Sequence, residues 1–209
     1  MRRRIVCLMF VLVIAGWCSA TTLNDFESYA DTLALKAEWT NTANLTLALA
    51  TNPPDPNVYG GLKSMRYSYN CGASPYYAKS EYRLPGVVWG VSGVDWRNEA
   101  NLSFMYEVTK VKEPLHIKIM DCYGAQLYDW NLGTVPVGPW KEAVLDLQAN
   151  LTQAQLYTVG RLDIVMIAVN YGTGIIYFDD FKTTVIPEPA TLAMLGVGSL
   201  ALIRRQRRF

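Results

Sequence analysis

A two-residue alternation of apolar and polar side chains recurs along the middle of this 209-residue chain. It is clearest in NLSFMYEV from Asn101, PLHIKIMD from Pro114 and LDIVMIAVN from Leu162. Successive side chains of a β-strand point to opposite faces, so each stretch predicts a strand with one buried and one outward face. This alternation restricts the chain to β structure more strongly than any other feature.

About nine or ten short strands of this kind fit into residues 21–184, and the last is GIIYFDDFKTTV from Gly174. TNPPDPNVYGG, VPVGP and YGTG between them are turn sequences rich in Gly, Pro and Asn. LTQAQLYTV and TLALKAEW each suggest a short helix. We therefore predict one all-β domain, an antiparallel β-sandwich, over residues 21–184.

The N-terminus has the three parts of a secretory signal peptide. Three arginines at 2–4 precede an uncharged run at 5–17, and Cys18-Ser19-Ala20 supplies small residues for cleavage after Ala20. A retained membrane anchor is the weaker alternative, because the run is short and a good cleavage site follows it. We predict that signal peptidase removes residues 1–20 and that the remaining chain is exported.

The C-terminus, residues 185–209, carries a second apolar run. Pro187-Glu188-Pro189 precedes 14 uncharged residues at 190–203. The run is short for a transmembrane helix, which needs about 20 residues. It ends in the cluster Arg204, Arg205, Arg207 and Arg208. Arginines fix the cytoplasmic end of a membrane segment, so we predict that the run is a transient membrane stop.

The near-neutral net charge of +1 conceals an acidic body. Seven of the 19 Lys and Arg lie in the two ends, but a single one of the 18 Asp and Glu does. Residues 21–184 therefore hold 12 basic and 17 acidic residues, a net charge of −5. An acidic surface argues against nucleic acid or anionic lipid as a partner.

The order of the three C-terminal parts, together with the signal peptide, resembles the PEP-CTERM sorting signal. Such tails occur on exported proteins of bacteria that make exopolysaccharide. The resemblance implies recognition and cleavage near Pro187-Glu188-Pro189 by an exosortase-type membrane protease. It also implies that the apolar run is a sorting helix, which anchors the protein transiently in the inner membrane. The body would then be delivered to the cell surface or the extracellular matrix.

The body resembles the jelly-roll, galactose-binding-like carbohydrate-binding modules. NDFESY opens it, Trp39 and GGLKSMRYSY follow, and YFDDFKTT closes it. In these modules the first and last strands lie side by side and hold a structural Ca²⁺. The resemblance places this ion among the side chains Asp25, Glu27, Asp179 and Asp180 and the carbonyls of the Gly60-Gly61 loop. Solvated carboxylates, or carboxylates paired with Lys63 or Lys182, are the alternative.

Aromatic side chains supply the candidate ligand site, because sugar C–H faces stack on flat rings. Tyr128 and Trp130 are two residues apart on one predicted strand, so their rings would form a platform for successive sugar units. Lys118 and Glu107 would supply hydrogen bonds from neighbouring strands, and the loop with Trp89 is the second candidate. Packing is the alternative role, since aromatic residues are common in strands.

Enzyme motifs are missing from the sequence. No compact motif pairs two carboxylates for glycoside hydrolysis. Ser-His-Asp catalysis would have to use the single histidine, His116, and the sequence has no G-x-S-x-G motif to supply the nucleophile. Cys71 and Cys122 are left after signal-peptide removal, either as one disulfide or as two thiols. We predict a non-enzymatic surface or matrix protein that binds polysaccharide. A structural matrix protein without a ligand site and a glycan hydrolase are the alternatives.

Overall fold

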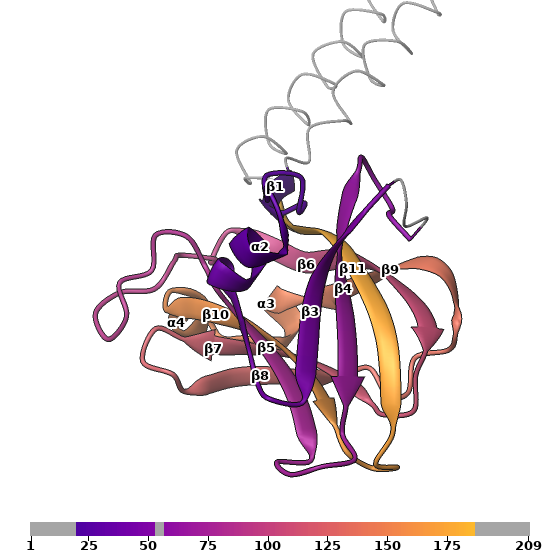
Figure 1. Ribbon diagram of the computed structural model, residues 1–209. Coiled ribbons are helices and arrows are strands. Elements are labelled where there is room, and N and C mark those ends of the chain that lie inside the picture. The colour runs from indigo at the N-terminus through magenta and orange to yellow at the C-terminus, as the bar shows by residue number, and fades with distance from the viewer. Residues whose placement is uncertain (1–19, 53–56, 187–209) are drawn as a thin grey trace, which may run out of the picture.

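The computed structural model describes residues 20–52 and 57–186. They form two antiparallel β-sheets that pack face to face, with short helices beside them (Figure 1). This is the jelly-roll type of β-sandwich, so the predicted fold class is confirmed.

The larger sheet has six strands, in the order β3-β4-β11-β6-β9, with β1 also paired to β11. The strands are β1 (Ala20–Asn24), β3 (Leu45–Thr51), β4 (Lys63–Asn70), β6 (Glu99–Lys110), β9 (Gly138–Asp146) and β11 (Thr173–Val185). Strand β11 pairs with β1, β4 and β6, so the last strand of the body holds the sheet together.

The smaller sheet has five strands, in the order β2-β5-β10-β7-β8. The strands are β2 (Trp39–Asn41), β5 (Tyr77–Arg83), β7 (Leu115–Asp121), β8 (Gln126–Asn131) and β10 (Val159–Ile167). Strand β10 lies between β5 and β7, so its outward side chains lie at the centre of the sheet.

The hydrophobic core fills the space between the two sheets, and the strand alternation explains which side chains reach it. In β4, Met65, Tyr67 and Tyr69 are buried in the core, and the residues between them point outward. Phe104 and Phe181 stack in the core with their ring centroids 5.0 Å apart. Burying one such ring stabilises the fold by roughly 1.5–3 kcal/mol.

Three short helices connect the strands in the described ranges, and each begins after a side-chain cap. Helix α2 (Thr32–Glu38) begins after Asp31, whose carboxylate accepts two backbone N–H bonds. Helix α3 (Leu147–Asn150) is followed by α4 (Gln153–Leu156), where Thr152 begins a capping box. α2 and α4 lie in the two stretches for which the sequence predicts short helices.

The two ends of the described body meet at one edge of the larger sheet. Ala20 pairs with Thr184 and Asn24 pairs with Phe181 across the antiparallel β1–β11 ladder. The first and last strands are therefore side by side, as the resemblance to the carbohydrate-binding modules implied.

The predicted signal peptide and sorting tail fall almost entirely outside the described residues, at 1–19 and 187–209. In the part of the chain that the structure describes, no helix is long and apolar enough to span a membrane. Cys71 and Cys122 are both buried, and they are free thiols rather than a disulfide.

Candidate functional site

The side of the five-stranded sheet that faces away from the core carries mostly charged side chains. The neighbours of these side chains along each strand, such as Ala78, Ile117 and Ile164, belong to the core. We call this side the polar face. Its outward residues are Tyr77, Lys79, Glu81, Arg83, His116, Lys118, Met120, Asp129, Arg161, Asp163, Val165 and Ile167.

A chain of ion pairs forms the floor of the polar face. Arg161 donates from Nε and Nη2 to the two carboxylate oxygens of Asp163, at 2.7 and 3.0 Å. Its Nη1 lies 3.2 Å from Glu81 Oε2, and Lys79 Nζ lies 2.5 Å from Glu81 Oε1. Burial raises the pKa of Asp163, and the hydrogen bonds from Arg161 oppose this rise. The network fixes its side chains in place and thereby offers preorganised donors and acceptors.

A second group of charges continues the floor toward β8. Asp129 Oδ1 lies 2.8 Å from His116 Nδ1, and Asp129 Oδ2 lies 3.1 Å from Lys118 Nζ. Lys118 Nζ also donates to Gln126 Oε1 at 3.1 Å. The polar face therefore has hydrogen-bonding groups across its whole width.

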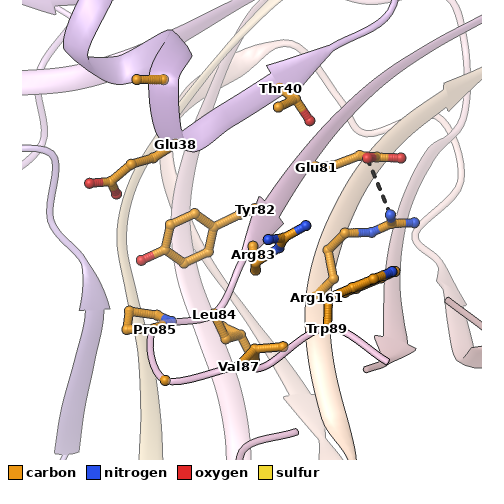
Figure 2. Close-up of a pocket in the computed structure, with 12 residues that line it drawn as sticks. Glu38, Thr40, Glu81, Tyr82, Arg83, Leu84, Pro85, Val87, Trp89 and Arg161 are labelled. Carbon is orange, nitrogen blue, oxygen red and sulfur yellow. Dashed lines mark hydrogen bonds and ion pairs between the residues drawn. The ribbon is translucent and has the colours of Figure 1, made fainter. Parts of the chain in front are cut away.

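Of the cavities on this face, two have Arg161 among their lining residues. The larger has a volume of about 660 Å³ and lies over the ends of β2 and β5, where Tyr82, Arg83, Trp89 and Arg161 line it (Figure 2). The smaller, of about 430 Å³, has Tyr77, Lys118 and Arg161 among its lining residues. Because Arg161 lines both cavities, they adjoin along β5 and β10, and we call the two together the groove.

The Trp89 ring is held at the edge of the larger cavity by a tight turn. Val91 N donates to Val88 O at 3.0 Å, and Gly90 has a φ of +76°. These features fit a type II turn, which requires glycine at its third position. A Cβ added at Gly124 would lie 3.3 Å from Trp89 Cζ2, so the ring packs closely against this glycine.

The structure separates the predicted platform from its predicted hydrogen-bonding partners. Trp130 and Tyr128 lie opposite Ile117 and Ile119 in the β7–β8 ladder, and both rings pack against the core. Their ring centroids are 4.6 Å apart. Lys118 points to the other side of the sheet, so the prediction that it shares a face with the two rings is wrong.

Glu107 lies still further from this arrangement. It is on β6 of the six-stranded sheet, opposite Tyr177 of β11, whereas Lys118 is on β7 of the other sheet. Lys118 therefore lies on the strand next to Tyr128 and Trp130, as predicted, whereas the prediction that Glu107 also lies on a neighbouring strand is wrong. Of the predicted ligand residues, Lys118 lies on the polar face and Trp89 lies on the rim of its larger cavity.

The four predicted metal-binding carboxylates come together around one cavity. Together with Tyr59, Gly60 and Gly61, they line a cavity of about 310 Å³. We call the set Asp25, Glu27, Asp179 and Asp180 the acidic corner. The loop predicted to supply carbonyl groups is thus next to the predicted carboxylates.

Hydrogen bonds hold the carboxylates of the acidic corner. Glu27 Oε1 accepts the backbone N–H groups of Leu62 and Lys63 at 2.7 and 2.8 Å. Lys63 Nζ donates to the backbone carbonyl of Glu27 rather than to a carboxylate. Lys182 Nζ lies 3.0 Å from Asp180 Oδ2, so the lysine pairing considered as an alternative to a metal ion exists at Asp180.

Asp179 is the buried member of the acidic corner, with 2% of its surface exposed. Burial raises the pKa of Asp179 to about 7. The hydrogen bonds from the backbone N–H groups of Gly60, Asp180 and Tyr59 lower it but do not offset burial. A buried carboxylate with oxygen-rich surroundings suits Ca²⁺, which takes six to eight oxygen ligands. However, no group of three or more Asp, Glu, His or Cys in the described ranges could hold a metal ion as arranged. Calcium at this corner stays a prediction.

Sequence reasoning missed Glu81, Arg161 and Asp163 at the centre of the polar face. YAKSEYR at 77–83 alternates, which would have placed Lys79 and Glu81 on one face. The contact between Glu81 and Arg161 depends on the β5–β10 register, which joins segments 80 residues apart.

Comparison with known proteins supports two separate parts of this description. Residues 185–208 match the sequence profile of the PEP-CTERM protein-sorting motif. The match marks an exported, membrane-processed protein and implies processing by an exosortase. No curated protein matches the sequence.

The sandwich is similar to known carbohydrate-binding modules. A family 11 module from Clostridium thermocellum, solved with a β-1,3-1,4-mixed-linked tetrasaccharide, aligns with a TM-score of 0.55 and 17% identity over 83% of this chain and 99% of that one. A family 30 module from a C. thermocellum cellulosomal cellulase aligns with a TM-score of 0.56 and 16% identity over 81% and 99%. An arabinose-bound GH51 α-L-arabinofuranosidase aligns with a TM-score of 0.56 and 19% identity over 81% of this chain but 27% of that enzyme. At these identities the likeness establishes the fold.

Proposed function

We propose that this chain is an exported, non-enzymatic polysaccharide-binding protein of the cell surface or extracellular matrix. The groove on the polar face carries the proposal. Its floor consists of interlinked charged side chains that can hydrogen-bond sugar hydroxyls, and aromatic rings lie at its two ends. Carbohydrate sites combine these same two elements, because sugars have both apolar C–H faces and hydroxyl edges.

The groove is long enough for a polymer rather than a single sugar. Tyr77 and Arg83 lie at opposite ends of β5, roughly 20 Å apart at about 3.3 Å per residue. A glycan chain that lies along β5 and β10 would contact Tyr77 and Lys79 at one end and Trp89 at the other. Lys118, one of the predicted residues, would bind it from the neighbouring strand β7.

The non-enzymatic part of the proposal rests on how the carboxylates of this face are held. Glu81, Asp163 and Asp129 each form an ion pair with Lys or Arg. An ion-paired carboxylate is already engaged by a cation of the protein, whereas a general acid has to offer its proton to the substrate.

A glycan array tests the proposal on purified residues 21–186, followed by affinity electrophoresis in gels that contain the polysaccharides bound on the array. We expect retardation by at least one polysaccharide, and a weaker effect for the Lys79→Ala/Lys118→Ala double variant. A reducing-sugar assay on the same polysaccharides should show no release. Absence of all binding would favour a structural matrix protein, and sugar release would favour a hydrolase.

A further inference from the structure

Two arginines face each other at the Trp89 end of the polar face. Arg83 of β5 lies directly opposite Arg161 of β10 in the antiparallel register. Like charges placed directly opposite on neighbouring strands destabilise a sheet. Asp163 and Glu81 compensate the charge of Arg161, whereas Arg83 forms no ion pair with any residue that the structure describes.

Trp89 contacts both guanidinium groups without neutralising either. Arg83 Cζ lies 5.2 Å from the centre of the indole ring, and Arg161 Cζ lies 5.6 Å from it. A cation–π contact leaves the net charge of the guanidinium unchanged. The Arg83 end of the cavity therefore keeps an uncompensated positive charge beside a flat ring.

The carboxylates around the same cavity are already held by other partners. Glu81 accepts from Arg161 and pairs with Lys79. Glu38 Oε2 accepts the hydroxyl of Tyr29 at 2.7 Å, and Figure 2 shows Glu38 on the other side of Tyr82 from Arg83. The guanidinium of Arg83 thus remains available to a negatively charged group that enters the cavity.

We infer that the Arg83–Trp89 end of the groove binds the carboxylate of a hexuronic acid unit within the polysaccharide. Arginine presents parallel N–H donors that match a carboxylate bidentately, and the indole ring would take the C–H face of the same sugar. The inference rests on the proposed function, because it names the sugar class that the same groove selects. It assigns Arg83 as the specificity-determining residue.

The net negative charge of the body favours a local carboxylate site over general attraction of polyanions. A net charge of −5 over residues 21–184 repels polyanions in general, so retention of an acidic glycan requires a local site rather than bulk attraction. Arg97 provides a matched control, because its Cζ lies 4.6 Å from the Tyr157 ring centroid and it pairs with Asp95 instead of facing the groove.

Affinity electrophoresis of residues 21–186 tests the inference with alginate, polygalacturonate, hyaluronan and xanthan, each beside its carboxyl-reduced form. We expect stronger retardation by the native form of at least one polymer than by its reduced form. Arg83→Gln should weaken that binding by at least about tenfold, the effect of losing a charged hydrogen bond. Arg83→Lys should retain part of it, and Arg97→Gln should behave as the wild type. Melting temperatures of all variants establish that they are folded.

The possible results separate the inference from the proposed function. Equal binding of native and reduced polymers, or an Arg83→Gln variant that binds as the wild type, overturns the inference and leaves polysaccharide binding intact. Dextran sulfate bound as tightly as the uronate polymers, with the same dependence on Arg83, overturns the assignment to a carboxylate. If neither these polymers nor the neutral glycans of the array bind, the proposed function itself fails.

Discussion

Ala20 and Thr184 are cross-strand partners at the start of β1 and near the end of β11. Ala20 and Val185, the described strand residues nearest to the two predicted processing points, therefore both belong to the six-stranded sheet. The polar face belongs to the other sheet. Neither Ala20 nor Val185 therefore lies on a strand of the polar face.

The first prediction concerns how much of the C-terminus the body needs. A chain of residues 21–186 should melt at the same temperature as one of residues 21–209, because β11 ends at Val185. A chain that ends at Phe181 should melt many degrees lower, since it lacks Thr183, which is 1% exposed, and three of the four β11 partners of β1. Calorimetry of the three chains measures this. Equal stability of the shortest chain would show that β1–β11 pairing is dispensable.

The second prediction follows from the raised pKa of Asp179, about 7 against an ordinary value of 3.8. Between these values the folded protein keeps a proton that the unfolded chain has lost. The free energy of unfolding therefore falls as pH rises from about 4 to about 7, by at most about 1.4 kcal/mol per unit. Urea unfolding in EDTA between pH 5 and 8 measures the slope. Asp179→Asn should flatten it, and an unchanged slope in that variant would assign it to other groups.

The third prediction is that Ca²⁺ stabilises the body through the acidic corner. The ion would replace the proton on Asp179, so the gain should be larger at pH 8 than at pH 5. Binding to the folded state alone adds about 2.7 kcal/mol at 100 times Kd. Asp179→Asn should remove the rise in melting temperature. Asp95→Asn, at an exposed ion pair with Arg97, should keep it. Identical melting in calcium and in EDTA would exclude the ion.

The fourth prediction concerns Glu113, whose side chain is fully buried. Its carboxylate accepts the N–H groups of Val169, Asn170 and Gly172 at 2.6, 2.9 and 2.5 Å. Burial opposes ionisation, but these donors hold its pKa below the ordinary value. Its stabilisation is therefore present above about pH 4.5 and is lost as the pH falls through the lower folded-state pKa.

Glu113→Gln should lower the free energy of unfolding by about 3 kcal/mol at pH 7, because the amide turns an N–H group toward these donors. Urea titration at pH 7 and at pH 3 measures the loss, which should shrink at the lower pH. Glu142→Gln, on the exposed side of β9, is the control and should cost little. A loss that is equal at both pH values would show that ionisation of Glu113 is unimportant.

The fold could be predicted from the sequence because period-two alternation is a local property. It placed Ile117 and Ile119 in the core and Lys118 outside, as the structure does. In β8, however, apolar residues occur on both faces, since Leu127 precedes Tyr128 and Trp130. Alternation groups the two rings together but does not say which side faces the core. The register with β7 decides this, and register is a tertiary property.

The site was harder to predict for the same reason. The sequence identified the residues of the acidic corner because both of its motifs lie at the ends of the body, where the first and last strands pair. The groove combines Glu81 and Arg161 from strands far apart in the chain. Trp89 lies in a loop whose position over β5 no local pattern shows. The charged residues within the predicted strands could therefore be identified from the sequence, but the residues with which they pair could not.

The last prediction distinguishes the ring on the groove from the ring on the predicted strand. Trp89 is 38% exposed and lines the larger cavity. Trp89→Ala should therefore weaken polysaccharide binding about tenfold, which corresponds to roughly 1–2 kcal/mol for one aromatic contact. The melting temperature should not fall. Trp130 packs against the core and the Tyr128 ring. Trp130→Ala should therefore lower the free energy of unfolding by about 2 kcal/mol, below the cost of a fully buried ring, and leave the affinity of the folded protein unchanged.

Affinity electrophoresis and thermal melts of both variants, with Trp89→Phe as the matched control, measure the difference. Trp89→Phe should retain most of the binding, because a flat ring remains at the end of the turn. Loss of binding in Trp130→Ala at an unchanged melting temperature, with Trp89→Ala as the wild type, would place the platform on β8 as the sequence predicted. In that case a glycan would have to reach the core side of β8 at the edge of the sheet, and the ion-paired floor of the polar face would have no ligand to bind.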